Sequence, residues 1–528
     1  MGDKYDRQLR LWGAEGQRRL ASAHVLLVRA GATGAETLKN LVLPGVQRFT
    51  VLDDALVSKA DATNNFFVSD AALGRPRAEV VTNLLLEMNR DVAGSFRHAS
   101  PLAVFQDEPE YLDQFDLVIA TQLDEAPTKL LADLCLAKHI PLLVVVSYGL
   151  LGYFRLQAAQ HTILDAKNDP PLHELRVSRP FPALRQFADG FALDSLSTIE
   201  HAHVPFVVLL LKAMDQWKAA HGGAAPATFP EKAAFKQELQ SLAWGPPGHE
   251  VNFLEAAESA YKAYVPPLVP EEVADVLRAA QTKQDFGADT PDFWWLAGAL
   301  AAFVERHNDG MLPITGVVPD MTAATESYVA LQELYVAKAK EDAAKVLELV
   351  HELLVAHGQP ADRISSDQAV EYCKNSYNIA MLDTRTVAQE FAAVDLSSVD
   401  LEDEDPKQSP LVWYFLLRAV AAFASQFHRY PGSADAESKQ DGVWLVEAAK
   451  RLAAGASEDT GNQVAAWISA DHALEMTRSC EVELHNIAAL LGGVASQEAI
   501  KLLTHQFVPL NHTYVFNGIC GTAATYNL

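Results

Sequence analysis

Short apolar segments alternate with amphipathic helical patterns over the first part of the chain. Helical patterns such as RPRAEVVTNLLLEMN separate four strand-like segments, which are HVLLV (24–28), RFTVLD (48–53), FDLVIAT (115–121) and PLLVVVSYG (141–149). Nearly continuous apolar strands that alternate with helices are typical of a parallel sheet covered by helices on both faces. The alternation therefore predicts an α/β domain over residues 1–165.

The pattern changes after this domain. Residues 166–480 are mainly helical, rich in Ala and Leu, and interrupted by short loops. The longest helical pattern runs from about Thr322 to Ala356, with apolar residues at spacings of three and four, and His357-Gly358 ends it. We therefore expect one large, mainly helical insertion over residues 166–480.

The C-terminal tail returns to a compact pattern. Residues 485–505 have an apolar helical pattern rich in small residues, which favours close packing against a neighbouring element. HTYVFNG (512–518) and TAATYNL (522–528) have the pattern of two strands joined at Asn517-Gly518, a hairpin-turn signal. Residues 481–528 are therefore expected to form a helix and strands that rejoin the first sheet.

The composition is that of a globular protein of 528 residues, with 49% hydrophobic and 21% charged residues. A formal charge of −26 opposes non-specific binding to nucleic acid or to an anionic membrane. The four cysteines lie far apart without a CxxC pair, which fits a reducing compartment. The N-terminus is charged and the apolar runs are too short and interrupted to span a bilayer, so we expect a cytoplasmic or nuclear protein.

The stretch VLLVRAGATGAETLKN (25–40) has the pattern of a strand, a small-residue turn and a helix start. Phosphate-binding loops have this form, because glycines let backbone N–H groups approach the phosphates at a helix N-terminus. An acidic residue about 20 positions later binds the ribose hydroxyls. Gly31, Gly34 and Asp53 fit these positions, but Arg29 replaces the first glycine. The loop alone leaves two interpretations open: a nucleotide site, or a retained fold without its ligand.

Several further motifs accompany this loop along the chain. They are KYDRQLRLWG (4–13), AGATGAE (30–36), VLDD (51–54), NNFFV (64–68), LGRPRAE (73–79), LPITGVVPDM (312–321) and QEAIKLLT (497–504). Over nearly the whole chain they resemble the ubiquitin-activating enzyme family, and most of all the noncatalytic subunits of its heterodimeric members. The resemblance implies a Rossmann-like adenylation domain with a pseudo-nucleotide site, split by the helical insertion.

The same resemblance identifies what the pocket lacks. Active members carry a complete glycine loop, a second aspartate two residues after the first, and an Asn-x-x-Arg-Gln segment whose arginine contacts phosphate. The corresponding residues here are Arg29, Ala55 and Asn64, and a neutral side chain cannot replace a phosphate-binding cation. The resemblance therefore implies that this chain binds no cofactor, and that ATP and Mg are bound by a catalytic partner. The degenerate loop consists of Arg29, Gly31, Gly34 and Asp53.

One acidic position of the active family members is retained. Asp124 stands where active subunits place a metal-associated aspartate. Without its companions it is expected to be a solvated loop carboxylate, and no metal site is predicted.

Arg7 is the first functional candidate outside the loop. In the family, the arginine of an N-terminal Tyr-x-Arg-Gln segment reaches ATP phosphates bound by the other half of the dimer. Residues 5–8 match that segment. A guanidinium delivered across an interface neutralises phosphoryl charge. The resemblance thus implies that Arg7 reaches ATP bound by the partner, whereas the residue taken alone favours a solvated arginine on a helix face.

A catalytic cysteine is not expected in this chain. Cys135 lies in an apolar helical pattern, Cys373 and Cys480 lack a nearby histidine or helix-start signature that would favour a thiolate, and Cys520 follows the hairpin turn. None of Cys135, Cys373, Cys480 and Cys520 resembles the family's catalytic-cysteine segment. The insertion is therefore expected to be the cysteine-domain half without its catalytic cysteine.

The sequence His201-Ala202-His203 lacks a recognisable third metal ligand, and surface or interface histidines are far more common than such sites. The resemblance instead places His203 and the segment 320–333 near the catalytic partner. The partner-binding candidates are His203, Asp320, Met321, Tyr328, Leu331 and Gln332. Tyr328 and Leu331 are candidate apolar anchors, and a role in the chain's own core is the equally weighted alternative.

The resemblance implies a regulatory subunit, inactive alone, of the heterodimeric enzyme that activates a Nedd/Rub ubiquitin-like modifier. Its partners would be the catalytic subunit, in an obligate heterodimer, the modifier, and as a further candidate the conjugating enzyme. Three alternatives remain open: a free-standing adenylating or NAD-binding enzyme, an adaptor without an activating role, and the regulatory subunit for the modifier of sumoylation. An insertion of about 300 residues argues against the last, because those subunits are much shorter.

Overall fold

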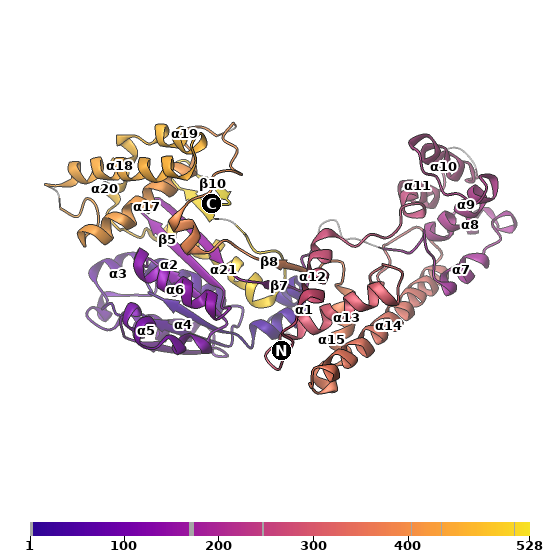
Figure 1. The fold of residues 1–528 in the computed structure, drawn as a ribbon, viewed down its shortest axis with the longest axis horizontal. Helices are drawn as coiled ribbons and strands as arrows, with labels where there is room; N and C mark the ends of the chain where they lie inside the picture. Colours follow the sequence, from indigo (N-terminus) through magenta and orange to yellow (C-terminus); the bar gives the residue numbers. More distant parts are fainter. Residues whose placement is uncertain (1–3, 168–173, 245–247, 403, 435, 512) are drawn as a thin grey trace. The chain divides into compact units, whose positions relative to one another are not determined.

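The structure is a computed structural model that describes residues 4–167, 174–244, 248–402, 404–434, 436–511 and 513–528. These residues form two compact units. Unit 1 combines the chain up to Ile163 with Leu382–Leu528, and unit 2 is Leu164–Met381. Unit 1 therefore contains both the N-terminal and the C-terminal part of the chain (Figure 1).

Unit 1 is built on one large sheet. Its strands are β1 (His24–Val28), β2 (Arg48–Leu52), β3 (Ala93–Arg97), β4 (Leu117–Thr121), β5 (Leu142–Tyr148), β6 (Leu151–Gln157), β9 (Thr513–Asn517) and β10 (Thr522–Tyr526). In the described residues their order is β10-β9-β6-β5-β4-β1-β2-β3. Strands β1 to β5 run parallel, and β6, β9 and β10 are antiparallel. The sheet confirms the predicted α/β fold.

Helices cover both faces of this sheet, as its fully buried central strands require. They are α1 (Asp6–Leu20), α2 (Ala32–Val42), α3 (Lys59–Asn64), α4 (Arg77–Met88), α5 (Pro101–Asp107), α6 (Glu125–Ala137), α16 (Val387–Ala392), α17 (Pro410–Phe427), α18 (Ser438–Ala456), α19 (Thr460–Trp467), α20 (Ala470–Ser479) and α21 (His485–Thr504). Short 3-10 turns lie at Asp70–Ala72 and Pro109–Gln114, and the short strand β7 is His161–Ile163.

Helices α2 and α21 make the most extensive helix pair in unit 1. Their close approach depends on Gly492, where a Cβ atom would lie 2.8 Å from the backbone nitrogen of Thr37. A side chain at this position would force the helices apart. The small-residue pattern of α21 is thus explained by its packing against α2.

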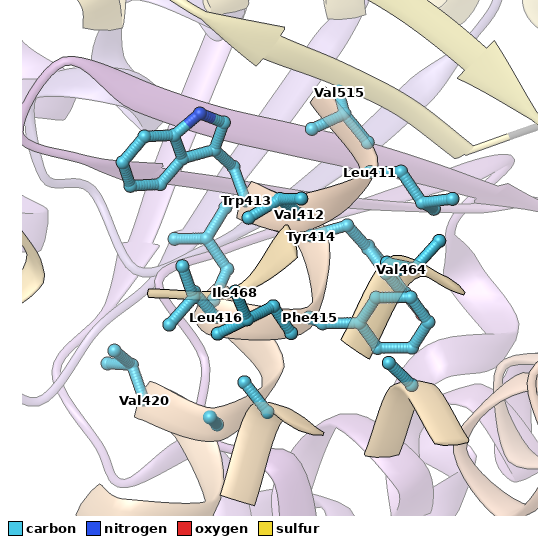
Figure 2. Packing of buried hydrophobic residues seen from close by; sticks show 14 of the residues in the cluster. Leu411, Val412, Trp413, Tyr414, Phe415, Leu416, Val420, Val464, Ile468 and Val515 are labelled. Atoms are coloured by element: carbon cyan, nitrogen blue, oxygen red, sulfur yellow. The ribbon is translucent and has the colours of Figure 1, made fainter. Parts of the chain in front are cut away.

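Helix α17 is buried on nearly all sides. Figure 2 shows its apolar side chains gathered with residues of α19 and β9, among them Leu411, Phe415, Val464 and Val515. By length and composition α17 and α21 could each cross a membrane, but 67% of each segment is buried inside the structure. A helix that is apolar all round and buried in this way is a core helix of a globular unit.

The position of α17 changes the division of the chain expected from the sequence. Residues 382–480, expected in the helical insertion, lie in unit 1, where α17 packs on β6, β9 and β10. Helices α18, α19 and α20 in turn gather around α17 (Figure 1). Helical periodicity could not separate these helices from the insertion, because an apolar pattern indicates that one face of a helix is buried but not which element covers it.

Unit 2, Leu164–Met381, is helical. Its helices are α7 (Pro182–Asp189), α8 (Thr198–His201), α9 (Phe206–Ala220), α10 (Phe229–Ser241), α11 (Val251–Glu258), α12 (Glu271–Thr282), α13 (Asp292–Arg306), α14 (Thr325–Ala356) and α15 (Ser366–Lys374). One apolar core surrounds α9 and a second lies between α12, α13, α14 and α15. The long helix α14 follows the predicted pattern and starts three residues later than expected, because Thr322 instead bonds to Glu255.

Two histidines lie face to face in unit 1, with His161 buried and His505 half-buried. The rings of His161 and His505 stack with centroids 4.8 Å apart, and His505 Nδ1 donates to the Thr162 carbonyl at 2.6 Å. Burial and the nearby Arg19 lower the pKa of His505 to about 4, and burial lowers the pKa of His161 as well. Both imidazoles are therefore neutral in the folded chain at pH values where a histidine of an unfolded chain, with a pKa of about 6.5, binds a proton.

We expect unit 1 to lose stability as the pH falls. The stabilisation is complete above about pH 6.5 and is lost toward pH 4, and for His505 it amounts to at most roughly 3 kcal/mol. His505→Asn removes one titrating ring and keeps the left-handed backbone at this position, where φ is 55°. Its denaturation midpoint should fall less steeply with pH than that of the unmodified chain. Parallel pH profiles of the two proteins would contradict the assignment.

Candidate functional site

The loop between β1 and α2 is shaped by two residues. Arg29 follows β1 with φ at 63°, a left-handed conformation that glycine adopts more readily. Gly34, in the first turn of α2, has no room for a side chain, because a Cβ atom would lie 2.6 Å from the Arg29 carbonyl oxygen. The glycine at position 34 therefore serves close packing of α2 on the sheet. The loop keeps its fold although its first glycine is an arginine.

The Arg29 side chain turns toward the end of β4. Its Nη1 donates to the Gln122 carbonyl at 2.5 Å, and its Nη2 lies 3.6 Å from Asp124 Oδ2. Asp124, expected to be a solvated loop carboxylate, is half exposed and forms this ion pair. The guanidinium and the retained family aspartate thus partner each other.

A carboxylate from a distant part of the chain lies at the N-terminus of α2. The backbone N–H groups of Ala32 and Thr33 donate to Glu483 Oε2 and Oε1, both at 3.0 Å. A Cβ atom at Gly31 would lie 2.2 Å from Glu483 Oε2, so the glycine is required for this contact. These are the N–H groups that hold phosphate when such a loop binds a nucleotide. Here they are already satisfied by the chain itself.

Asp53, the expected ribose-binding residue, is fully buried and fully bonded. Its carboxylate accepts from the backbone N–H groups of Ala30 and Ala55, at 2.8 and 3.0 Å. Arg77 adds two more bonds to Asp53, from Nε at 2.7 Å and from Nη2 at 3.3 Å, and its Nη1 also binds Asp61 at 2.9 Å. Burial disfavours the charge of Arg77, but the two carboxylates outweigh it and raise its pKa. Asp53 is therefore a structural anchor with no bond left for a ribose.

The two neighbouring asparagines, Asn64 and Asn65, have different surroundings. Asn65 is buried and structural, since its side chain donates to the Ala30 carbonyl at 3.3 Å and accepts from the Phe67 N–H at 3.0 Å. Asn64, which replaces the family's phosphate-binding arginine, is half-buried and lines the remaining cavity.

The cavity beside Glu483 has a volume of about 280 Å³. That is slightly below the range of about 300–1,000 Å³ usual for small-molecule pockets. Three of its lining side chains are acidic, and the full lining is Ala32, Ser58, Ala60, Asp61, Asn64, Asn65, Arg77, Cys480, Glu481, Val482 and Glu483. Arg77 is committed to Asp53 and Asp61, so the wall opposes a triphosphate. The residues present do not fit ATP.

Arg7 lies on the exposed side of α1. Its neighbour Arg10 pairs with Asp6 at 2.9 Å, whereas Arg7 forms no ion pair within the part of the chain that the structure describes. Gly13 interrupts α1 with φ at 70° and ψ at 179°, so the turns that carry Arg7 are offset from the rest of the helix. The guanidinium is thus free to meet a partner, and its predicted role remains a prediction.

Three of the four cysteines lie in surroundings that disfavour the thiolate. Cys135 and Cys373 are buried, and burial raises the pKa of each thiol to about 12. Cys480 is partly exposed, and burial again raises its pKa, while Cys520 is exposed beside the β9–β10 turn. Among the described residues, no group of three or more His, Cys, Asp or Glu side chains could hold a metal ion.

In unit 2 the two histidines of residues 201–203 separate. His201 is buried against Trp244, with ring centroids 3.8 Å apart, and bonds to Glu250 at 2.8 Å. His203 is exposed, and its carbonyl accepts from the Ala324 N–H at 2.9 Å. The structure therefore brings His203 next to the segment 320–324, as a shared surface would require.

The remaining candidates differ in exposure. Asp320 is exposed, and Gln332, Met321 and Tyr328 are half-buried, the last two packed at the edge of the core around α9. Leu331 is fully buried in that core. Its assignment as a partner contact is wrong, because an unexposed side chain has no surface to offer, and the core alternative holds for this residue.

Two residues of the pocket were missed by the sequence reasoning. Glu483 lies some 450 positions from the N–H groups that it binds, and no local pattern marks it. Arg77 belongs to the LGRPRAE motif, and a buried aspartate at the end of β2 is the signal that a nearby cation is needed.

Comparison with known proteins identifies the family. The ThiF family model matches residues 5–522. The chain belongs to the ThiF family. It is 36% identical to the NEDD8-activating enzyme E1 regulatory subunit of Danio rerio, over 99% of this chain and 98% of that protein. The chain is also 36% identical to the NEDD8-activating enzyme E1 regulatory subunit AXR1 of Arabidopsis thaliana, over 98% of this chain and 94% of that protein. It is 26% identical to the NEDD8-activating enzyme E1 regulatory subunit of Saccharomyces cerevisiae, over the full length of both chains.

Arg77→Met tests the anchoring of Asp53. The substitution keeps an unbranched side chain but leaves the Asp53 carboxylate buried with its two backbone donors only. We expect the free energy of unfolding to fall by about 3–5 kcal/mol, as on breaking a buried ion pair. Denaturant titration of the full chain measures this, with Arg75→Met as the control because Arg75 is half exposed and pairs with Glu79. Equal midpoints for the two variants would contradict the anchor role.

Proposed function

We propose that this chain is the regulatory, noncatalytic subunit of the heterodimeric enzyme that activates a Nedd/Rub ubiquitin-like modifier. The observation that carries the proposal is its similarity, over nearly the whole length of both chains, to proteins named NEDD8-activating enzyme E1 regulatory subunit. The partner subunit would bind ATP and Mg, adenylate the modifier and carry it as a thioester. This chain would complete the dimer without catalysing a step alone.

The pocket supports this division of labour. Phosphate-binding N–H groups, the ribose-binding aspartate and the nearest guanidinium all have intramolecular partners. Binding of ATP would first have to break these internal bonds. We therefore assign the chain no cofactor of its own.

Arg7 is the residue by which this chain would act on the reaction. It is exposed, lies near the N-terminus, and lacks an ion-pair partner among the residues that the structure describes. A guanidinium placed on the phosphates of ATP in the partner would stabilise charge that develops during adenylation. Its contribution would be electrostatic and would require the assembled heterodimer.

Unit 2 offers a surface for the partner or the modifier. His203, Asp320, Met321, Tyr328 and Gln332 are exposed or half-buried there, and the bond between His203 and Ala324 holds the two segments together. The conjugating enzyme is a further candidate for binding to the assembled enzyme. A cytoplasmic or nuclear location fits this function.

The test is Arg7→Ala in the heterodimer reconstituted with the catalytic subunit. We expect adenylation of the modifier, followed as ATP–pyrophosphate exchange, to slow by roughly 10²-fold while the heterodimer still assembles. Arg10→Ala is the matched control, because Arg10 lies one turn further along α1 and pairs with Asp6. Equal rates for Arg7→Ala and the unmodified heterodimer would contradict the role of Arg7. Failure of the unmodified chain to support any adenylation would favour the adaptor alternative.

A further inference from the structure

The segment that delivers Glu483 is a strained connection between α20 and α21. We call residues 479–484 the strap. Cys480 and Glu481 are consecutive and both left-handed, with φ at 38° and 67°. Each such non-glycine residue costs energy and persists only where its surroundings hold it. The strap therefore has a conformation that the rest of unit 1 must stabilise.

The strap is fixed to the end of β5. The Gly149 N–H donates to the Val482 carbonyl at 2.8 Å, and Gly149 pairs with Glu483 in an isolated parallel bridge. A Cβ atom at Gly149 would lie 2.2 Å from Ser479 Oγ, so the chain there needs both the glycine and its φ of 56°. This attachment positions the Glu483 side chain at the N-terminus of α2.

The Glu483 carboxylate binds α2 as a free anion would. Its two oxygens each accept from one of two successive N–H groups of the first turn, and Ser147 Oγ lies 3.5 Å from Oε1. The first N–H groups of a helix have no intrahelical acceptor, and the helix dipole favours negative charge there. The bidentate contact thus satisfies two donors that a phosphate would otherwise satisfy.

We propose that the N-terminus of α2 is an anion site whose permanent ligand is the chain's own Glu483. The pocket is then closed in two ways: by the residues that replace its nucleotide-binding groups, and by an internal carboxylate that the strap inserts into it. This contact lies within unit 1 and goes beyond the proposed function, because it involves residues of this chain alone.

The surroundings define which anion could replace the Glu483 side chain. Asp61 and Glu481 also line the cavity, and Arg77 is already paired with two carboxylates. A small monoanion such as formate restores the lost charge without adding more, whereas a triphosphate brings several charges to an acidic wall. With Glu483 removed, the site should therefore accept formate and not ATP.

Chemical rescue of Glu483→Ala tests this inference on the full chain. We expect the variant to lose about 2–4 °C in Tm relative to the unmodified chain, as on removing a helix cap. Sodium formate should restore most of this loss, measured against sodium chloride at equal ionic strength, and should leave the unmodified chain unchanged. Glu481→Ala is the matched control, because Glu481 lies in the same strap and makes no bond to α2.

Three results would overturn the inference. One is an unchanged Tm for Glu483→Ala. The second is a Tm loss that formate does not restore, and the third is equal stabilisation of variant and unmodified chain by formate. If Glu483→Ala does not fold, Glu483→Gln keeps the side chain in place and offers one acceptor in place of two, so its Tm should lie below that of the unmodified chain, and an unchanged Tm would overturn the inference. If the reconstituted heterodimer does not adenylate the modifier, that result contradicts the proposed function and leaves the inference about Glu483 unchanged.

Discussion

The close contact between α2 and α21 is the constraint on which the pocket of unit 1 depends. Gly492 lets the two helices approach so closely that a Cβ atom there would meet the backbone of α2. Because α21 begins at His485, this packing places the residues just before it above the N-terminus of α2. The Glu483 carboxylate reaches the first N–H groups of α2 from that position. The packing of α21 on α2 therefore also positions the carboxylate that occupies the N-terminus of α2.

The charged side chains of the pocket are also paired within the chain. Arg77 balances the buried Asp53 and also Asp61, and Arg29 meets Asp124. A buried carboxylate is tolerated only with such partners. In an adenylating pocket some of these groups would be left for a nucleotide and its metal ion. Here each of these groups has a partner within the chain.

The sequence predicted the parts of the molecule that depend on local pattern. The strand at residues 24–28, the hairpin at Asn517-Gly518 and the long helix that ends at Ala356 follow from apolar periodicity and turn residues. The degenerate loop was also recognisable, since the replacement of a glycine by Arg29 is visible in the sequence itself.

The long-range parts could not be predicted. Glu483 reaches its N–H partners only through the folding of the whole of unit 1, and its strap carries no glycine to signal a left-handed turn. The resemblance placed Leu331 near the partner, with a core role as the equal alternative, and helical spacing could not decide between them because it marks an apolar face without indicating what covers it. The same ambiguity assigned α17 to the insertion, although it packs on the sheet.

This chain keeps a nucleotide-binding fold in which its own side chains bind the groups that would hold a nucleotide. Calorimetric titration of ATP with Mg²⁺ into the purified full chain, without a partner, tests it most directly. We expect no heat of binding up to millimolar nucleotide. Binding with micromolar affinity would contradict the account, because Glu483, Asp53 and Arg29 would then have to release their present partners at little cost.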